Sequence, residues 1–239
     1  MRKQIILAIF LLAAVNGLAF ADSLSDAMRA LQADDNAKAA KLLLPLAQRG
    51  GRIAQSTLGL LYDYGKGVPQ DYKEAAKWYL LSIAQGADGP EVPDRLAWMY
   101  RFGKGVTQEP KEALKWYRVA AGLGKTSALS SLGDMYGSGE GTPQDYVEAA
   151  QWYRLAAEYG DTSGQFHLGY MYGVGHGVPA NIVLSHMWIN IASANEKDGT
   201  RQKAAAQTRD SIAQLMTAQQ LAEAQELAKK CTANKFKGC

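Results

Sequence analysis

The chain has 239 residues, of which 47% are hydrophobic and 21% are charged. This balance excludes an intrinsically disordered chain and is typical of one sizeable folded domain or two small ones. The formal net charge is +3, and Arg2 and Lys3 lie in a leader that we expect to be removed, which leaves about +1 on the mature chain. A nearly neutral protein is not expected to have nucleic acid or an anionic membrane as its main partner.

The first 21 residues have the features of a secretory signal peptide. A basic start is followed by an apolar run from Ile5 to Val15 and by Ala19-Phe20-Ala21, which places small residues where a signal peptidase needs them. We therefore expect export, to the periplasm or, alternatively, as a secreted protein. An uncleaved N-terminal anchor is a second alternative, although the apolar run is short for a membrane span. No later segment predicts a span in the mature chain.

The only two cysteines, Cys231 and Cys239, lie in the last nine residues. Exported proteins fold in oxidising surroundings, so we expect a disulfide that closes a small C-terminal loop. In the chain-entropy model such a loop stabilises the fold by about 2–3 kcal/mol. A redox-active or metal-binding pair is the alternative, but the spacing is not Cys-x-x-Cys and no histidine lies nearby.

Four segments of the chain repeat one pattern, at steps of 38, 36 and 36 residues. Each segment has a Leu-Gly or Leu-Ala pair, a tyrosine four residues after the leucine, a Gly-x-Gly turn and a Trp-Tyr pair, which is Trp-Ile in the fourth segment, always at the same offsets. A fixed period of this length is typical of solenoid repeats. The recurring positions are the leucine pairs 58–59, 96–97, 132–133 and 168–169, the turns 65–67, 103–105, 139–141 and 175–177, and the tryptophan pairs 78–79, 116–117, 152–153 and 188–189.

Each segment predicts two helices joined by the glycine turn. In the first segment Ala54, Leu58 and Tyr62 follow one another at steps of four residues, which places them on one helical face. The turn ends this helix because glycine readily adopts positive φ. Asp71 is a candidate N-cap for the second helix, and Asp145 matches it two repeats later. One hairpin cannot bury both of its faces, so the hairpins must stack, which predicts an all-α solenoid.

The pattern Ala-x-x-x-Leu-Gly-x-x-Tyr, Gly-x-Gly-Val and Asp-Tyr-x-x-Ala-x-x-Trp-Tyr resembles the Sel1-like repeat family, which is related to the tetratricopeptide repeat, over about residues 50–195. The resemblance implies a right-handed α/α superhelix of helix-turn-helix repeats at about 51–86, 87–124, 125–160 and 161–196. It also implies a capping half-repeat at 22–50, and capping helices with the disulfide loop at 197–239. Asn181 and Ile189 depart from the pattern in the fourth repeat, which suits a repeat that meets a cap.

The resemblance also implies a function. Sel1-like proteins are mostly scaffolds that bind other proteins or peptides, and the family carries over no catalytic residues. We therefore expect a non-enzymatic periplasmic or secreted adaptor that binds a protein or peptide and needs no cofactor. Two alternatives stay open. One is a β-lactamase-like hydrolase, although the cysteine-rich relatives linked to that activity carry cysteine pairs that these repeats lack. The other is a secreted host-interaction (virulence) factor.

The consensus aromatic residues are expected in the core, so a binding surface is expected on the opposite face of the first helix of each repeat. In tetratricopeptide-like solenoids this helix lines the concave surface. Aromatic anchors among a few charges suit the capture of a peptide. The candidate groove residues are Leu60, Asp63, Asp94, Trp98, Arg101, Asp134, Phe166 and Tyr170. The alternative is that Trp98 and Phe166 pack against adjacent repeats.

No catalytic or metal site is expected. His167 and His186 stand alone within helical segments, and no cysteine or carboxylate cluster accompanies them at ligand spacing. His176 occupies a Gly-x-Gly turn and is expected to face solvent.

Overall fold

A computed structural model describes residues 22–86 and 89–239 of the chain, and the predicted signal peptide lies outside these residues. The secondary structure of the described residues is entirely helical, as predicted. None of the helices in these two ranges is both long and apolar enough to cross a membrane. The chain divides into two compact units, Met1–Gln108 and Glu109–Cys239.

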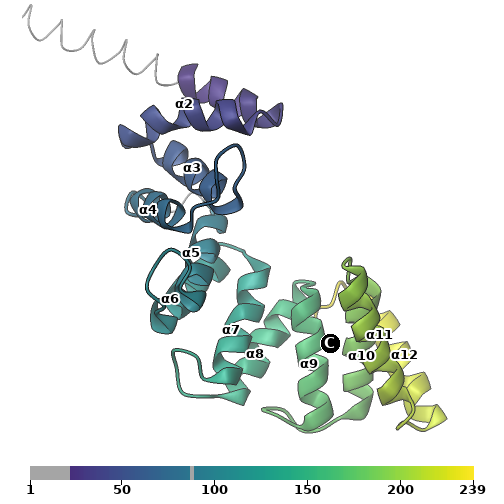
Figure 1. Cartoon of the computed structure of the whole chain (residues 1–239). Helices are drawn as coiled ribbons and strands as arrows, with labels where there is room; N and C mark the ends of the chain where they lie inside the picture. The colour runs from purple at the N-terminus through teal and green to yellow at the C-terminus, as the bar shows by residue number, and fades with distance from the viewer. Residues whose placement is uncertain (1–21, 87–88) are drawn as a thin grey trace, which may run out of the picture. The chain divides into compact units, whose positions relative to one another are not determined.

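Unit 1 contains a helix at residues 22–32 and four further helices, each of which packs against the next one in the chain. These are α2 (Asn36–Gln48), α3 (Arg52–Tyr64), α4 (Tyr72–Ile83) and α5 (Glu91–Phe102), labelled in Figure 1. Apolar side chains form one core beneath α2 and α3 and a second between α4 and α5. The first repeat is therefore covered by a helix on both sides.

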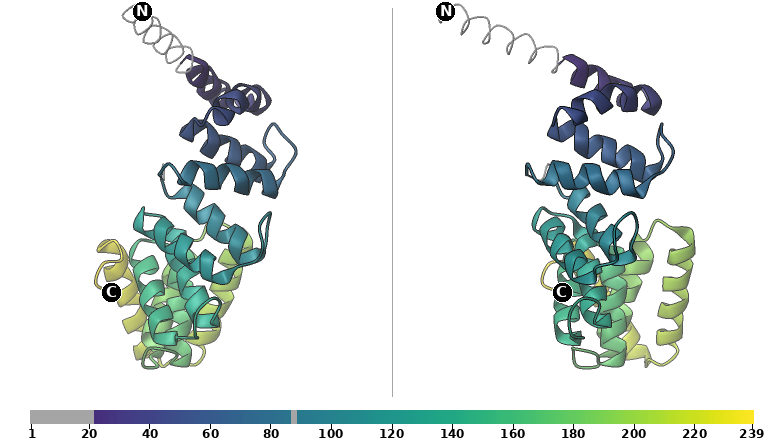
Figure 2. Two further views of the ribbon diagram at one scale, coloured as in Figure 1. Left: turned by 90° about the vertical axis from the view of Figure 1, so that its left-hand side faces the viewer. Right: turned by 60° about the vertical axis from the view of Figure 1, so that its left-hand side comes forward.

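Unit 2 continues the succession of helix hairpins and ends in two capping helices, which Figure 2 shows from two further sides. Helix α10 packs against α9 on one side and against both α11 and α12 on the other. The helices are α6 (Pro110–Gly122), α7 (Thr126–Ser138), α8 (Tyr146–Glu158), α9 (Thr162–Val174), α10 (Ile182–Asn195), α11 (Gly199–Ala213) and α12 (Ala218–Ala233).

The helix ends follow the predicted capping residues. The Asp71 carboxylate accepts hydrogen bonds from the backbone N–H groups of Lys73 and Glu74 at 2.9 and 3.0 Å, and Asp145 caps α8 in the same way. The first glycine of each turn ends the preceding helix in the left-handed region, with φ between 64° and 78°. Local signals are sufficient to predict these helix ends because a capping residue contacts only its own helix.

The second glycine of each turn has a role that the sequence did not reveal. A Cβ atom on Gly177 would lie 2.0 Å from the carbonyl oxygen of Tyr146, at the start of the second helix of the preceding repeat. A Cβ atom on Gly105 would lie 2.2 Å from the carbonyl oxygen of Tyr72, in the corresponding place. The turn therefore ends one helix and also docks against the preceding repeat.

Small residues allow the two helices of a hairpin to approach closely. A Cβ atom on Gly59 would lie 2.6 Å from the ring of Tyr79, and one on Gly133 would lie 2.6 Å from the ring of Tyr153. In the first and third repeats the consensus tyrosine therefore fills the space that glycine leaves.

The consensus aromatic residues are buried with four exceptions. Trp78, Tyr79 and Trp188 are at most 5% exposed, and the tyrosines that follow tryptophan in the second and third repeats are buried as well. The exceptions are only half-buried, contrary to the expectation that all of them are core; they are Trp116, Trp152, Tyr62 and Tyr100. In Trp152 the indole N–H donates to the Glu148 carboxylate at 3.0 Å, so the polar edge of the ring can stay at the surface.

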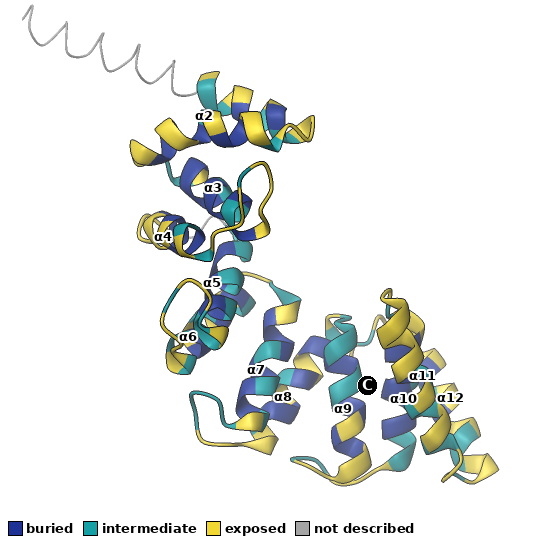
Figure 3. Cartoon of the chain, in the orientation of Figure 1, coloured by how far each residue is buried: buried dark blue, intermediate teal, exposed yellow. Residues whose placement is uncertain are grey.

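The C-terminal cap consists of α11 and α12. Thr217 starts α12 with a capping box, in which it exchanges hydrogen bonds with Gln220. Figure 3 shows that α10 is largely buried whereas α11 is largely exposed, and Ala205 is the buried residue of α11. The Cα atoms of Cys231 and Cys239 lie 5.6 Å apart, a separation that accommodates the predicted disulfide.

Candidate functional site

Asp63 does not line a groove, contrary to the prediction. It is 1% exposed, and its two carboxylate oxygens accept hydrogen bonds from the Arg95 guanidinium at 2.6 and 2.7 Å. The Tyr79 hydroxyl donates to the same carboxylate at 2.9 Å. A buried carboxylate needs such partners, and Arg95 reaches it from the next repeat. Burial and the Asp63 charge raise the pKa of Tyr79, and the hydrogen bond to Asp63 raises that of Arg95.

Leu60 and Trp98 come together in unit 1, where both pack against the core between α4 and α5. The Trp98 ring centroid lies 5.8 Å from that of Tyr72 on α4 and 5.7 Å from that of Phe102. The Arg95 guanidinium lies 4.6 Å from the Trp98 ring centroid. Trp98 therefore packs between two repeats, as the alternative interpretation had it.

The other two predicted groove residues of unit 1, Asp94 and Arg101, lie on α5 and are half-buried. The guanidinium of Arg101 lies 5.3 Å from the centroid of the Phe102 ring, which is 49% exposed. This end of α5 therefore offers a partner an aromatic ring beside a cation.

Trp98→Ala is expected to lower the stability of unit 1 by about 2–3 kcal/mol, somewhat less than the loss of a fully buried tryptophan. The reason is the loss of its contacts with Tyr72 and the core. Urea denaturation measures the change, and Phe102→Ala, at a ring 49% exposed, is the control with a smaller expected effect. An unchanged urea midpoint for Trp98→Ala would return Trp98 to the groove.

Asp134 and Phe166 are brought together in unit 2 through His167. The Tyr153 hydroxyl donates to Asp134 at 2.7 Å, and His167 Nε2 lies 4.0 Å from the same carboxylate. The His167 ring stacks on Tyr153 with centroids 5.0 Å apart, and Phe166 meets it edge-on at 5.7 Å. Tyr170, one helical turn beyond Phe166, is 51% exposed. Helix α9 thus presents aromatic side chains on the face opposite its core.

A pocket of about 200 Å³ opens beside Phe166 in unit 2, and we call it the α9–α11 pocket. Its walls combine the Phe166 ring with three alanines and a polar rim. The lining residues are Thr162, Ser163, Phe166, His167, Ala192, Glu196, Arg201, Ala204 and Ala205. Of these residues only Phe166 belongs to the predicted groove. Arg201, Ala204 and Ala205 come from α11, which lies beyond the repeat pattern.

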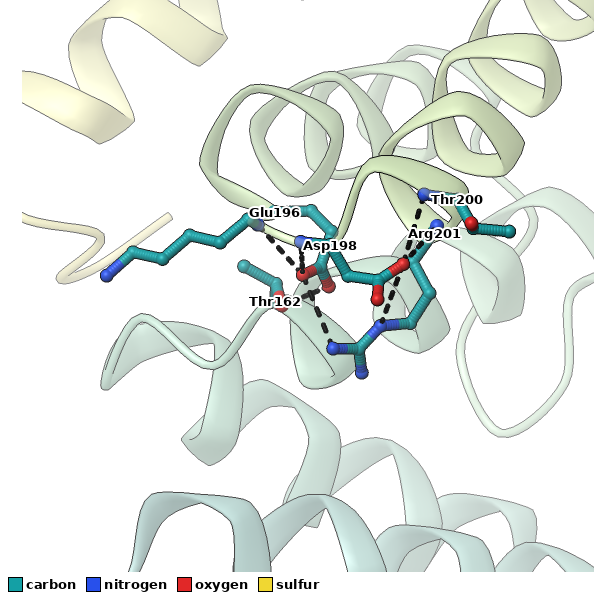
Figure 4. Close-up of polar contacts among 6 residues, drawn as sticks. Thr162, Glu196, Asp198, Thr200 and Arg201 are labelled. Atoms are coloured by element: carbon teal, nitrogen blue, oxygen red, sulfur yellow. Dashed lines mark hydrogen bonds and ion pairs between the residues drawn. The ribbon is translucent and has the colours of Figure 1, made fainter.

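Glu196 organises the rim of this pocket, as Figure 4 shows. Its carboxylate accepts hydrogen bonds from the backbone N–H groups of Lys197 and Asp198 at 2.8 and 2.9 Å and from the Thr162 hydroxyl at 2.9 Å, and it lies 3.5 Å from Arg201. The hydrogen bond from the Asp198 N–H is the main reason why the pKa of Glu196 is lowered. The carboxylate thereby links α9 to the start of α11.

A wider groove of about 870 Å³ lies among α10, α11 and α12. His186, which is 3% exposed, lines it together with Arg209 and Asp210. Burial and, to a smaller extent, Arg209 lower the pKa of His186, so the imidazole is neutral at pH 7. The described residues contain no group of three or more histidine, cysteine or acidic side chains arranged to hold a metal ion.

Comparison with known families identifies the repeats. Residues 53–86, 94–125, 126–161 and 162–196 match the family model described as Sel1 repeat, which covers more than half of the chain. The chain belongs to the Sel1 repeat family. Proteins of this family generally act as protein-interaction scaffolds and are typically not catalytic.

Solved structures with the same fold include two Sel1 repeat proteins. A protective antigen of uropathogenic Escherichia coli strains that displays an SLR fold superimposes with a TM-score of 0.67 at 36% identity, over 73% of this chain and 38% of that chain. A Sel1 repeat protein from Oxalobacter formigenes superimposes with a TM-score of 0.67 at 28% identity, over 79% of this chain and 76% of that chain. The chain thus spans 38% of the antigen's length. No curated protein matches the chain in sequence.

Proposed function

We propose that this Sel1 repeat protein is an exported, non-enzymatic adaptor of the periplasm, or a secreted one, that captures a segment of another protein on the first helices of its repeats. The observation that carries this proposal is the outer face of α9, where Phe166 lines an apolar pocket and Tyr170, 51% exposed, follows one helical turn later. The signal-peptide pattern of residues 1–21 supports export.

The apolar character of both faces of α9 supports this assignment. Leu168 and Met171 fill the core on one side, whereas Phe166 and Tyr170 lie on the other. A helix with one buried face normally carries polar residues on its opposite face. Aromatic side chains are enriched among residues that dominate protein–protein binding, so their presence outside the core favours a binding role.

Photo-crosslinking in the native host tests the adaptor function. A photoreactive phenylalanine analogue at Tyr170 is expected to capture a discrete protein in the exported fraction. The same analogue at Tyr159, which is 60% exposed but follows α8, is the control and is expected to capture much less of it. Equal capture at both positions, or a chain retained in the cytoplasm, would contradict the proposal.

Tyr170→Ala is expected to weaken the binding of the captured partner about tenfold, which corresponds to about 1.4 kcal/mol of binding free energy. Truncation of an interface residue that contributes substantially to binding costs more than about 1 kcal/mol. Because Tyr170 is half-exposed, its removal should leave the melting temperature almost unchanged. Titration calorimetry with the purified partner measures the affinity, and a large loss of stability would instead assign Tyr170 to packing.

A further inference from the structure

The size of the α9–α11 pocket limits what it can hold. Its volume of about 200 Å³ lies below the range of roughly 300–1,000 Å³ that is typical of sites for drug-sized ligands and cofactors. It is nevertheless several times the volume of roughly 30 Å³ that one water molecule occupies in the liquid. A group as large as one amino-acid side chain therefore fits the pocket better than a cofactor does.

The walls of the pocket favour an apolar occupant. Phe166 contributes an aromatic surface, and Ala192, Ala204 and Ala205 contribute methyl groups from α10 and α11. Ala192 and Ala205 are 2% and 5% exposed, so they belong to a packed wall that holds its shape. Transfer of an apolar side chain from water onto such a surface is favourable.

The buried charge at the rim, Glu196, already has its partners, which argues against a charged occupant. The Glu196 side chain is 11% exposed and accepts three hydrogen bonds in addition to its contact with Arg201. Arg201 lies between the Glu196 and Asp198 carboxylates, at 3.5 and 4.0 Å. A lysine or glutamate side chain that entered would lose its water and would have to compete with these existing partners.

We propose that the α9–α11 pocket receives one uncharged apolar side chain, of the size of leucine or phenylalanine, from an extended segment of the partner protein. This inference rests on the proposed adaptor function and specifies its partner. Phe166 belongs both to the pocket wall and to the outer face of α9. A segment anchored in the pocket can therefore continue along α9 towards Tyr170, one helical turn away.

Titration with small blocked amino acids tests the occupant directly. Methyl NMR signals of Ala192, Ala204 and Ala205 in the full mature chain report on the pocket wall. N-acetyl-leucinamide or N-acetyl-phenylalaninamide is expected to shift these signals saturably, with millimolar affinity. N-acetyl-lysinamide and N-acetyl-glutamic acid α-amide, which keep their charged side chains, are expected to bind at least tenfold more weakly. Equal shifts from the charged and the apolar compounds would overturn the proposal.

A pair of matched variants locates the binding. Ala204 lines the pocket and is exposed at its mouth, so Ala204→Leu is expected to fill the space and to weaken N-acetyl-leucinamide binding at least tenfold. Ala222→Leu makes the same change at an exposed position of α12 away from this pocket and should bind as the native chain does. Equal melting temperatures for the two variants verify that both are folded. Native-like binding by Ala204→Leu would overturn the proposal.

The adaptor function and the pocket proposal fail in different ways. If Ala204→Leu still captures the partner through Tyr170 with unchanged affinity, the pocket proposal is wrong and the adaptor function stands. If N-acetyl-leucinamide binds the native pocket but crosslinking at Tyr170 captures no protein, the adaptor function is wrong and the affinity of the pocket for apolar side chains stands.

Discussion

Asp63→Ala is expected to destabilise unit 1 by about 3–5 kcal/mol, because it leaves the Arg95 guanidinium without the carboxylate that compensates for its burial. The Arg95 side chain is 19% exposed and that of Asp63 is fully buried, so little water reaches the pair. The Tyr79 hydroxyl also loses its acceptor. Hydrogen exchange of the backbone amides of α3, α4 and α5, measured at increasing urea concentrations, gives the free energy of unfolding of this unit.

The double variant Asp63→Leu with Arg95→Met is the control for this experiment. It removes both charges at once and replaces them by apolar groups, so it is expected to recover most of the stability that Asp63→Ala loses. If the single variant lost less than about 1 kcal/mol, the size of a surface ion pair, the carboxylate would not be the buried link between α3 and α5.

Gly177→Ala is expected to destabilise unit 2 by about 3–5 kcal/mol, because it combines the cost of a left-handed alanine with a clash. Gly177 has a φ of 68°, and its new Cβ atom would lie 2.0 Å from the Tyr146 carbonyl oxygen. The carbonyl oxygen is a backbone atom and the position of the Cβ atom is fixed by the backbone, so no flexible side chain can move aside to relieve the clash. Thermal denaturation monitored by circular dichroism measures the effect.

Gly175→Ala is the matched control two residues earlier. Gly175 has a similar φ of 74°, but the nearest atom to its new Cβ would be the Ala180 Cβ at 3.3 Å. This variant should therefore cost only the left-handed conformation, about 1–2 kcal/mol. Equal losses for the two variants would mean that the second glycine of the turn does not dock against the preceding repeat.

The repeat architecture could be predicted because its signals are local and occur four times. Asp71 and Asp145 cap helices through their own backbone neighbours, and the first glycine of each turn ends a helix by its own conformation. The contact between Gly59 and Tyr79 could also be predicted from the sequence, since both positions recur at a fixed offset. Recurrence separates such signals from chance.

The candidate groove was predicted less well because helical geometry alone cannot tell which side another repeat covers. Asp63 was placed on the outer face by its angle around the helix, yet Arg95 from the next repeat encloses it. Trp98 was treated as an anchor although Tyr72 and the core occupy most of its surroundings. Tyr170 is exposed, as the prediction requires, and Phe166 is half-buried.

The sequence by itself determined the helical hairpins, their caps and their family, because each of these depends on residues that are close in the chain or repeated along it. Only the tertiary structure decided which polar residues are buried and where the α9–α11 pocket lies. The reason is that the pocket walls and the partner of Asp63 come from different hairpins, whose contact depends on how the repeats pack. The acidic residue of one repeat and the arginine of the next carry no shared sequence pattern that would pair them in advance.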